Sequence, residues 1–440
     1  MEKKQKSIDD ILPHDLIHRI LLRVPAKHLA RLRCVSKLWY SLISDPQFAE
    51  LHFHHSPAAT NATIFIDHIN RTVAYFVYLE ALFSDDIDTS PIKVVPPPFK
   101  KKKPPTDFEF LGSCRGFVLL HRDPHFLVVW NPLTGYSKRI SYSRIASRCV
   151  YKDIRLPCKF YLYGFGYDAS QDDYVIVVAW QDKDYHYHLD YLSLRTNSWI
   201  NLDAAFSKPS GVFDINSCGL FLNGAIHWLP HSPKTFRDAI LIFDLKERTF
   251  SRISGPEQPV KSAFSYSNLA LLGGCLALYY RNDVSHNTHI WVMKEYKVHS
   301  SWTLYEIPCN VYQLFCLSSN GDIIVRGYDE VEVGYFIYNV RGDLLTHFKD
   351  LYYPFRITDP VYTESLLPFP SDIKDKDKKK MKKKRKENNT LHGRWIYSRN
   401  EEPNTGKFPD VTVLVFLLST LIIMITDYIE IIAPTASNST

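Results

Sequence analysis

The sequence lacks the motifs by which many enzymes are identified. It has no P-loop, no His-Glu-x-x-His motif and no protein-kinase signature. Residues 112–116 (Gly-Ser-Cys-Arg-Gly) have the form of a nucleophile elbow, but the strand-like sequence 117–120 follows where that motif requires a helix. Gly164 and Gly166 form half of a dinucleotide fingerprint and are expected to lie in a turn. We therefore expect no catalytic residue and no cofactor.

Metal-ligand spacing and paired cysteines are also missing. The eight cysteines include no Cys-x-x-Cys pair, so we expect reduced thiols in the cytoplasm or the nucleus. The N-terminus has no apolar stretch of the kind that directs secretion. Two groups of histidines lack the cysteine or carboxylate pattern of a metal site, and we expect them to be solvated with no bound metal. These histidines are His52, His54, His55, His186 and His188.

A positive charge excess is absent from most of the chain. The net charge is +6, and residues 374–386 alone carry +8, which leaves −2 for all other residues. Because a nucleic-acid-binding surface needs a basic field on the folded part, we expect no nucleic-acid partner. The basic tract is typical of a solvated linker, with a nuclear-import or anion-binding segment as the alternative.

No uncharged apolar run reaches the ~20 residues of a membrane-spanning helix. The stretch 411–426 is sixteen residues long, and its extension to residue 433 includes Asp427 and Glu430. A membrane anchor formed by residues 411–433 remains one hypothesis. A buried helix and an atypical appendage are the alternatives.

The composition is that of a folded protein with more than one domain. The chain has 440 residues, of which 45% are hydrophobic and 14% aromatic. A chain of this length and composition is expected to form two or three globular domains.

Residues 11–43 have the spacing of three short amphipathic helices. Leu16, Ile17, Ile20 and Leu21 share one face of the first helix, and Pro25 interrupts the pattern. Further apolar positions indicate a second helix and then a third, which begins near Ser36 and stops at Asp45-Pro46; they are Leu29, Leu32, Leu38, Trp39, Leu42 and Ile43. So small a unit buries too little surface to be stable alone. Its apolar face is expected to pack against a partner protein or against the neighbouring domain.

The middle of the chain repeats one β-strand pattern five times. Each copy has an apolar strand, a polar turn and a second strand, and the copies are residues 128–140, 189–199, 241–250, 290–302 and 335–343. Their aromatic markers lie 61, 52, 48 and 45 residues apart, near the ~40–50-residue period of a propeller blade. Strands at 63–69, 73–78 and 92–95 would form an earlier blade, and residues 362–367 would close the ring. The pattern therefore favours six blades over a pair of β-sandwiches.

The N-terminal residues resemble the F-box, the helical motif that binds the Skp1-type adaptor of cullin-RING ubiquitin ligases. The resemblance rests on apolar, basic and aromatic residues in family order, among them Leu12-Pro13, Arg23-Val24-Pro25, Trp39 and Leu42-Ile43. It implies a Skp1-like adaptor and, through it, a cullin as partners. The residues expected to bind the adaptor are Leu12, Pro13, Leu16, Ile20, Leu21, Pro25, Leu29, Leu32, Val35 and Trp39.

The repeated region resembles the plant F-box-associated, kelch-like interaction domain. Its landmarks include residues 112–120, 130–135, 164–168 and 222–228, while a glycine doublet occurs once, at Gly273-Gly274, rather than in every blade as in true kelch repeats. The resemblance implies a non-catalytic substrate receptor of an SCF-type (Skp1-cullin-F-box) ubiquitin ligase, with an unknown protein as substrate. One alternative is a propeller interaction protein that acts outside a ubiquitin ligase. A glycan hydrolase would need convergent loop carboxylates from Asp182, Asp184, Asp283 or Asp329.

We thus predict an α+β multidomain chain with a small helical F-box and an all-β, six-bladed propeller-like domain. The predicted divisions are a disordered N-terminus, the F-box, the propeller, a basic linker, the apolar segment and a short tail. They span residues 1–7, 8–55, 60–370, 371–410, 411–433 and 434–440.

Overall fold

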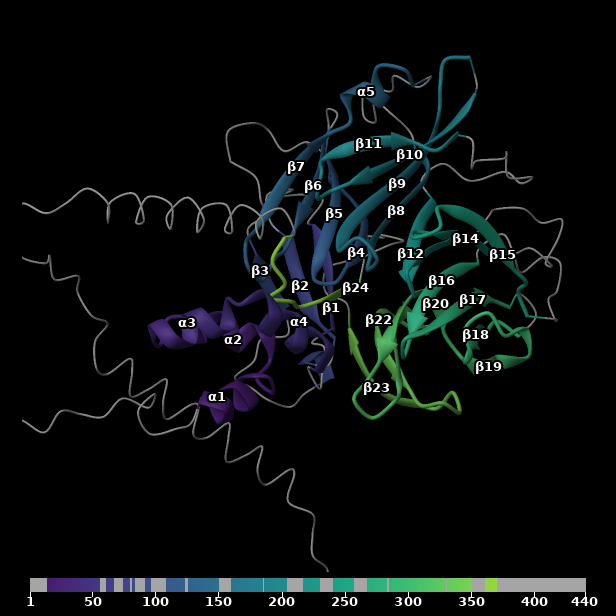
Figure 1. Cartoon of the computed structure of the whole chain (residues 1–440). Coiled ribbons are helices and arrows are strands. Elements are labelled where there is room, and N and C mark those ends of the chain that lie inside the picture. Colours follow the sequence, from purple (N-terminus) through teal and green to yellow (C-terminus); the bar gives the residue numbers. More distant parts are fainter. Residues whose placement is uncertain are drawn as a thin grey trace, which may run out of the picture.

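The computed structural model places a group of short helices beside a larger body of strands (Figure 1). It describes residues 14–55, 61–66, 74–79, 81–83, 92–95, 108–122, 126–149, 160–184, 186–203, 217–229, 240–256, 267–282, 285–329, 331–349 and 361–369. Leu12, Pro13, the basic tract 374–386 and the apolar segment 411–433 lie outside these residues. No helix in the described part is both long and apolar enough to cross a membrane.

Four helices open the described chain: α1 (His14–Leu21), α2 (Ala26–Leu32), α3 (Lys37–Ile43) and α4 (Pro46–His55). The first three confirm the predicted helices. Asp45 and Pro46 end α3 as predicted, and they also start α4. The Asp45 carboxylate accepts hydrogen bonds from the backbone N–H groups of Gln47 at 2.8 Å and Phe48 at 3.1 Å. Pro46 occupies the first helical position, where no N–H donor is needed.

The described strands form six four-stranded units. The first contains β24 (Val361–Thr363), β1 (Asn61–Ile66), β2 (Ala74–Tyr78) and β3 (Ile92–Val95), and the second contains β4 (Phe108–Cys114), β5 (Phe117–Arg122), β6 (Phe126–Trp130) and β7 (Ser137–Ser141). The third contains β8 (Phe160–Asp168), β9 (Asp173–Gln181), β10 (Tyr187–Ser193) and β11 (Ser198–Asn201), and the fourth contains β12 (Ser217–Leu222), β13 (Ala225–Trp228), β14 (Ile240–Asp244) and β15 (Thr249–Ile253). The fifth contains β16 (Asn268–Leu272), β17 (Cys275–Arg281), β18 (Thr288–Met293) and β19 (Trp302–Ile307), and the sixth contains β20 (Asn310–Leu317), β21 (Ile323–Tyr328), β22 (Val333–Tyr338) and β23 (Leu344–Lys349). Short helical turns at η2 (Ala81–Phe83), α5 (Ser143–Ala146) and η6 (His299–Ser301) lie between strands.

The first four repeated sequence patterns correspond to the last two strands of units two to five, and the fifth, residues 335–343, corresponds to β22 and the turn that leads into β23. Within each unit all neighbouring strands are antiparallel. The third and fourth units are joined into one eight-stranded sheet because β8 pairs in parallel with β12. This pairing brings together the first strands of two neighbouring blades, as expected where blades converge on a propeller axis.

A separate hydrophobic cluster joins each unit to the next. For example, one cluster contains Val175 of the third unit and Phe243 of the fourth, and another contains Ile242 of the fourth and Leu276 of the fifth. Further clusters join the first unit to the second, the second to the third, the fifth to the sixth, and the sixth back to the first. Six interfaces among six units describe a ring, whereas stacked sheets would have fewer and larger cores. The propeller-like arrangement is therefore confirmed.

The C-terminal end of the described chain closes this ring. Strand β24 pairs with β1, and the Asn131 side chain donates a hydrogen bond to the Ser365 carbonyl at 3.0 Å. Tyr362, Leu366, Leu367 and Phe369 are buried. The prediction that residues 362–367 close the ring is confirmed by the pairing of β24 with β1, although the strand itself spans only Val361–Thr363.

Residues 220–228 form a hairpin, in which Asn223 and Gly224 have positive φ values of 48° and 74° and make the turn. Two local predictions are wrong. Gly164 and Gly166 lie inside β8 rather than in a turn, and a Cβ at Gly164 would approach Ile226 to 2.5 Å. Six described cysteines carry free thiols, but Cys149 is disulfide-bonded rather than reduced.

Candidate functional site

The helical unit is built by side chains that cap its helices and fill its interior. The Ser36 hydroxyl accepts a hydrogen bond from the Trp39 backbone N–H at 3.1 Å and thereby starts α3. His52 of α4 is buried, and its Nε2 lies 2.7 Å from the Val24 carbonyl oxygen, so α4 is fastened to the segment between α1 and α2. Burial lowers the pKa of His52. The expectation of a solvated histidine is wrong here, whereas His54 and His55 are exposed as predicted.

The ten predicted adaptor-binding residues fall into three groups. Leu21, Leu29, Leu32 and Trp39 are buried in the helical core. Ile20, Pro25 and Val35 are partly exposed, and Leu16 has 45% of its surface exposed. Leu12 and Pro13 lie outside the described residues. The amphipathic spacing thus identified apolar positions, but it did not separate those that hold the helices together from those that face outward.

Two further apolar side chains of this unit face outward. Tyr40 on α3 is 58% exposed and Leu51 on α4 is 43% exposed. Neither was predicted, and local spacing gives little indication of them because each lies beside residues that pack inward. Together with Leu16, they provide exposed apolar side chains on three different helices.

Arg115 fixes the helices to the propeller. It lies in the turn between β4 and β5, and its guanidinium donates two hydrogen bonds to the Glu50 carboxylate of α4, at 2.5 and 2.6 Å. The same guanidinium lies over the Tyr167 ring at 4.0 Å and the Phe53 ring at 5.1 Å. A hydrophobic cluster continues from the helices into the propeller through residues that include Cys114, Phe117 and Tyr174. The helical unit therefore packs on its neighbouring domain while its outer side chains stay exposed.

The neighbouring Cys114 is a structural side chain in this turn. It ends β4, and the chain returns directly into β5 rather than into a helix. Burial raises the pKa of the Cys114 thiol, which disfavours a nucleophilic thiolate. Gly116 has φ 82°, as expected for a glycine that allows a tight turn.

Comparison with protein families decides the identity of both parts. The F-box domain model matches residues 10–51, and the model of the F-box associated beta propeller domain matches residues 61–343. The chain belongs to this family of F-box proteins. Its helical unit α1–α4 is the F-box, and its ring of strands is the F-box-associated domain.

Plant F-box proteins are among its relatives. The F-box protein CPR1 of Arabidopsis thaliana is 30% identical over 311 residues, which cover 66% of this chain and 71% of the relative. An F-box/kelch-repeat protein of the same plant is 29% identical over 309 residues, which cover 68% and 79%. A solved structure of a protein of unknown function from Bacteroides caccae matches 69% of this chain and 98% of its own chain at 10% identity, with a TM-score of 0.38.

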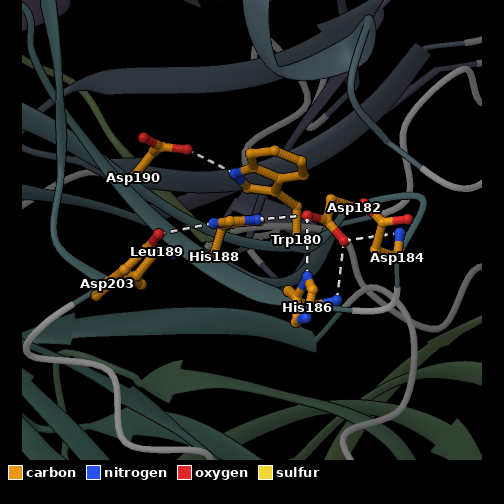
Figure 2. Close-up of polar contacts among 8 residues, drawn as sticks. All are labelled: Trp180, Asp182, Asp184, His186, His188, Leu189, Asp190 and Asp203. Carbon is orange, nitrogen blue, oxygen red and sulfur yellow. Dashed lines mark hydrogen bonds and ion pairs between the residues drawn. The ribbon is translucent and has the colours of Figure 1, made fainter.

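A polar cluster lies in the third blade, where β9 ends and β10 begins (Figure 2). His188 lies between two carboxylates: its Nε2 is 3.0 Å from Asp182 and its Nδ1 is 2.7 Å from Asp203. The ring stacks on Trp180 at 4.5 Å between centroids, and only 13% of the side chain is exposed. Burial alone would lower the pKa of His188, but the hydrogen bonds with Asp182 and Asp203 outweigh it and raise that pKa. The expectation of a solvated histidine is wrong for His188.

Asp182, Asp184 and His186 lie on the solvent side of this cluster. Each offers one oxygen or nitrogen atom, and these atoms all lie within 4.8 Å of one another. The Asp182 carboxylate also accepts hydrogen bonds from the backbone N–H groups of Asp184 and His186, both at 2.9 Å. Three carboxylates therefore surround the two histidines, although the sequence had indicated no such pattern. His186 is exposed, as predicted.

The four acids considered for a hydrolase do not form one group in the described part. Asp182 and Asp184 belong to the histidine cluster of the third blade. Asp329 follows β21 in the sixth blade, where its carboxylate accepts hydrogen bonds from the N–H groups of Val331 and Glu332. Asp283 lies outside the described residues.

Proposed function

We propose that this F-box protein is the substrate-recognition subunit of an SCF-type ubiquitin ligase. Its F-box docks on a Skp1-like adaptor, through which it joins a cullin, and its propeller binds a protein substrate for ubiquitination. The observation that carries this proposal is the joining of an F-box and an F-box-associated propeller through one hydrophobic core. Catalysis of ubiquitin transfer belongs to the partner subunits.

The exposed side of the F-box is the surface that we assign to the adaptor. Leu16 is exposed on α1, and Leu12 and Pro13 precede it in the sequence. Partly exposed Ile20, Pro25 and Val35 are further candidates. The four buried members of the predicted set act indirectly, because they hold the helices in the arrangement that presents the exposed ones. Exposed apolar side chains of this kind become favourable contacts once a partner removes them from water.

The junction gives the receptor a fixed geometry. Arg115 and the shared core hold the F-box against the turns at one end of the second and third blades. A substrate bound to the propeller is then held at a constant position relative to the adaptor. We infer that this rigidity is the functional reason for a buried arginine at the junction.

Affinity purification of the full-length protein with the proteasome blocked tests this function. We expect the adaptor, a cullin and ubiquitin conjugates to accompany the protein, and a substrate to accumulate with it. Recovery of propeller partners without adaptor, cullin or conjugates would instead favour an interaction protein that acts outside a ubiquitin ligase.

We also propose that the protein acts in the cytoplasm or the nucleus, with anchoring through residues 411–433 as the alternative. Cell fractionation of the full chain and of a 1–400 truncation separates the two. An anchor predicts that the full chain sediments with membranes while the truncation is soluble. Equal partitioning of both forms contradicts the anchor.

A further inference from the structure

His188 connects three neighbouring strands of the third blade, β9, β10 and β11. It lies in β10, opposite Trp180 of β9, and its ring stacks on the Trp180 ring. Asp182 directly follows β9, and Asp203 lies two residues after β11. One imidazole therefore contacts carboxylates from the segments on both sides of its own strand, at 3.0 Å through Nε2 and at 2.7 Å through Nδ1 (Figure 2).

These two contacts require a proton on each ring nitrogen. A neutral imidazole has one N–H donor and one lone pair, whereas the doubly protonated imidazolium donates from both nitrogens. The hydrogen bond with His188 lowers the pKa of Asp182. Burial would raise the pKa of Asp203, but its hydrogen bonds with His188 and the Leu189 backbone N–H outweigh burial and lower that pKa. Both acids therefore act as ionised acceptors, and both ring protons belong to His188.

Charged groups face this ring from each neighbouring segment of the described part. They are Asp182 after β9, Asp190 in β10, Asp203 after β11 and Arg148 after α5, with Asp184 and His186 on the exposed side of Asp182. Burial and the positive charge of Arg148 would lower the pKa of His188, but the hydrogen bonds with Asp182 and Asp203 outweigh them. The pKa of His188 therefore lies above its usual value of 6.5. The protonation state is thus expected to change at neutral or mildly alkaline pH.

Loss of one ring proton removes one of the two contacts. A lone pair of the imidazole would then face a carboxylate oxygen, and two acceptors repel each other where only 13% of the imidazole is exposed. The Asp203 carboxylate also accepts the Leu189 backbone N–H, and the Asp182 carboxylate accepts the backbone N–H of His186. Displacement of either carboxylate therefore also weakens the backbone contacts of β10 or of the residues before it.

We propose that His188 is a pH-sensitive clasp of the third blade. As an imidazolium it holds the end of β9 and the segment after β11 against β10, and when it loses a proton it releases one of them. The clasp uses contacts within the third blade and its flanking segments, so it does not depend on a ligase partner.

Proton linkage gives the direction of the effect. The folded protein binds the second proton of His188 more tightly than the unfolded chain does. The contribution of the clasp to stability is therefore fully present below pH ~6.5. It is lost as the pH rises through the higher pKa of His188 in the folded protein.

A pH titration of the full-length protein labelled with ¹⁵N-histidine, followed by NMR, tests the protonation state. We expect the signals lost in His188→Gln to titrate in the wild type with a midpoint above pH 6.5, with both ring nitrogens protonated below it. Asp203→Asn, which can still accept the Leu189 N–H, should weaken proton binding by roughly tenfold. The matched control is Glu306→Gln, because Glu306 contacts His289 and not His188. A midpoint at or below pH 6.5, or equal midpoints in wild type and Asp203→Asn, would overturn the proposal.

Amide hydrogen exchange of the full-length protein tests the clasp itself. After correction for the intrinsic exchange rate, we expect the protection of β10 and β11 to fall by about tenfold as His188 titrates. His188→Gln should show low protection at every pH, because glutamine does not titrate. His289→Gln should keep the wild-type loss, since His289 is also 13% exposed but contacts one carboxylate, that of Glu306. Constant wild-type protection across the titration of His188 would contradict the clasp even if the imidazole is doubly protonated.

Discussion

Arg115 of the propeller and Glu50 of the F-box form an ion pair that joins the two parts of the molecule, with both carboxylate oxygens of Glu50 against the Nη2 atom of Arg115. The arginine side chain is 13% exposed and the glutamate side chain 42%. The Arg115 guanidinium also lies over the rings of Phe53 and Tyr167. The contact therefore combines charge, hydrogen bonding and packing across the junction.

Replacement of Arg115 by alanine is expected to destabilise the full-length protein by about 1–3 kcal/mol. The change removes two charge-assisted hydrogen bonds and leaves the Glu50 carboxylate without this partner. Urea-induced unfolding measures the loss. Arg139→Ala is the control, because Arg139 is exposed and lies over one ring, that of Phe126. Equal effects of the two substitutions would contradict a special role for the junction.

Replacement of Gly116 by alanine tests the closure of the ring. A Cβ at this position would lie 2.1 Å from the Cβ of Ser365, in the segment that follows β24. We expect a loss of roughly 2–4 kcal/mol, from overpacking and from the positive φ of 82°. Gly135→Ala isolates the backbone effect, since Gly135 has φ 71° and open space around it, and should cost about 1 kcal/mol. Similar losses for both would mean that Ser365 does not pack against this turn.

His227 is expected to make stability depend on pH. It is fully buried, its Nδ1 lies 3.1 Å from the Leu220 carbonyl and its Nε2 lies 2.9 Å from the Tyr296 hydroxyl. Burial lowers its pKa from 6.5 to about 4. Because the unfolded chain then binds the proton more readily, stability is present above pH ~6.5 and falls as the pH drops towards 4, by roughly 3 kcal/mol.

Unfolding free energies of wild type and His227→Gln, measured between pH 7 and pH 4, check this expectation. The variant is less stable at pH 7, but the gap between the two proteins narrows as the pH falls. A constant gap between wild type and His227→Gln across this range would show that His227 does not contribute the pH dependence.

The sequence predicted the features that recur along the chain or depend on local spacing. The three amphipathic helices and the five strand pairs follow from hydrophobic periodicity, and Asp45-Pro46 marked the end of α3. Contacts between distant segments left no such signal. Gly164 was misassigned because the reason for glycine there is the close approach of Ile226, more than sixty residues away.

In the candidate sites too, local spacing predicted the positions of residues but not their contacts with distant segments. Spacing identified the apolar F-box residues, but it could not show that Trp39 is buried and Tyr40 exposed, which depends on how the helices pack. His188 was predicted to be solvated because Asp203 is fifteen residues away in sequence. Only the pairing of β10 with β11 brings that carboxylate to the imidazole.

The central claim is that the exposed side of the F-box docks on a Skp1-like adaptor. Binding of purified adaptor to the full-length protein and to the triple variant Leu12→Ala, Pro13→Ala, Leu16→Asp tests it most directly. Because Leu16 is 45% exposed, its substitution should leave the fold intact. Val331→Asp, at an 83% exposed apolar residue of the propeller, is the control. We predict at least tenfold weaker binding for the triple variant and unchanged binding for the control, whereas wild-type affinity in the triple variant would contradict the account.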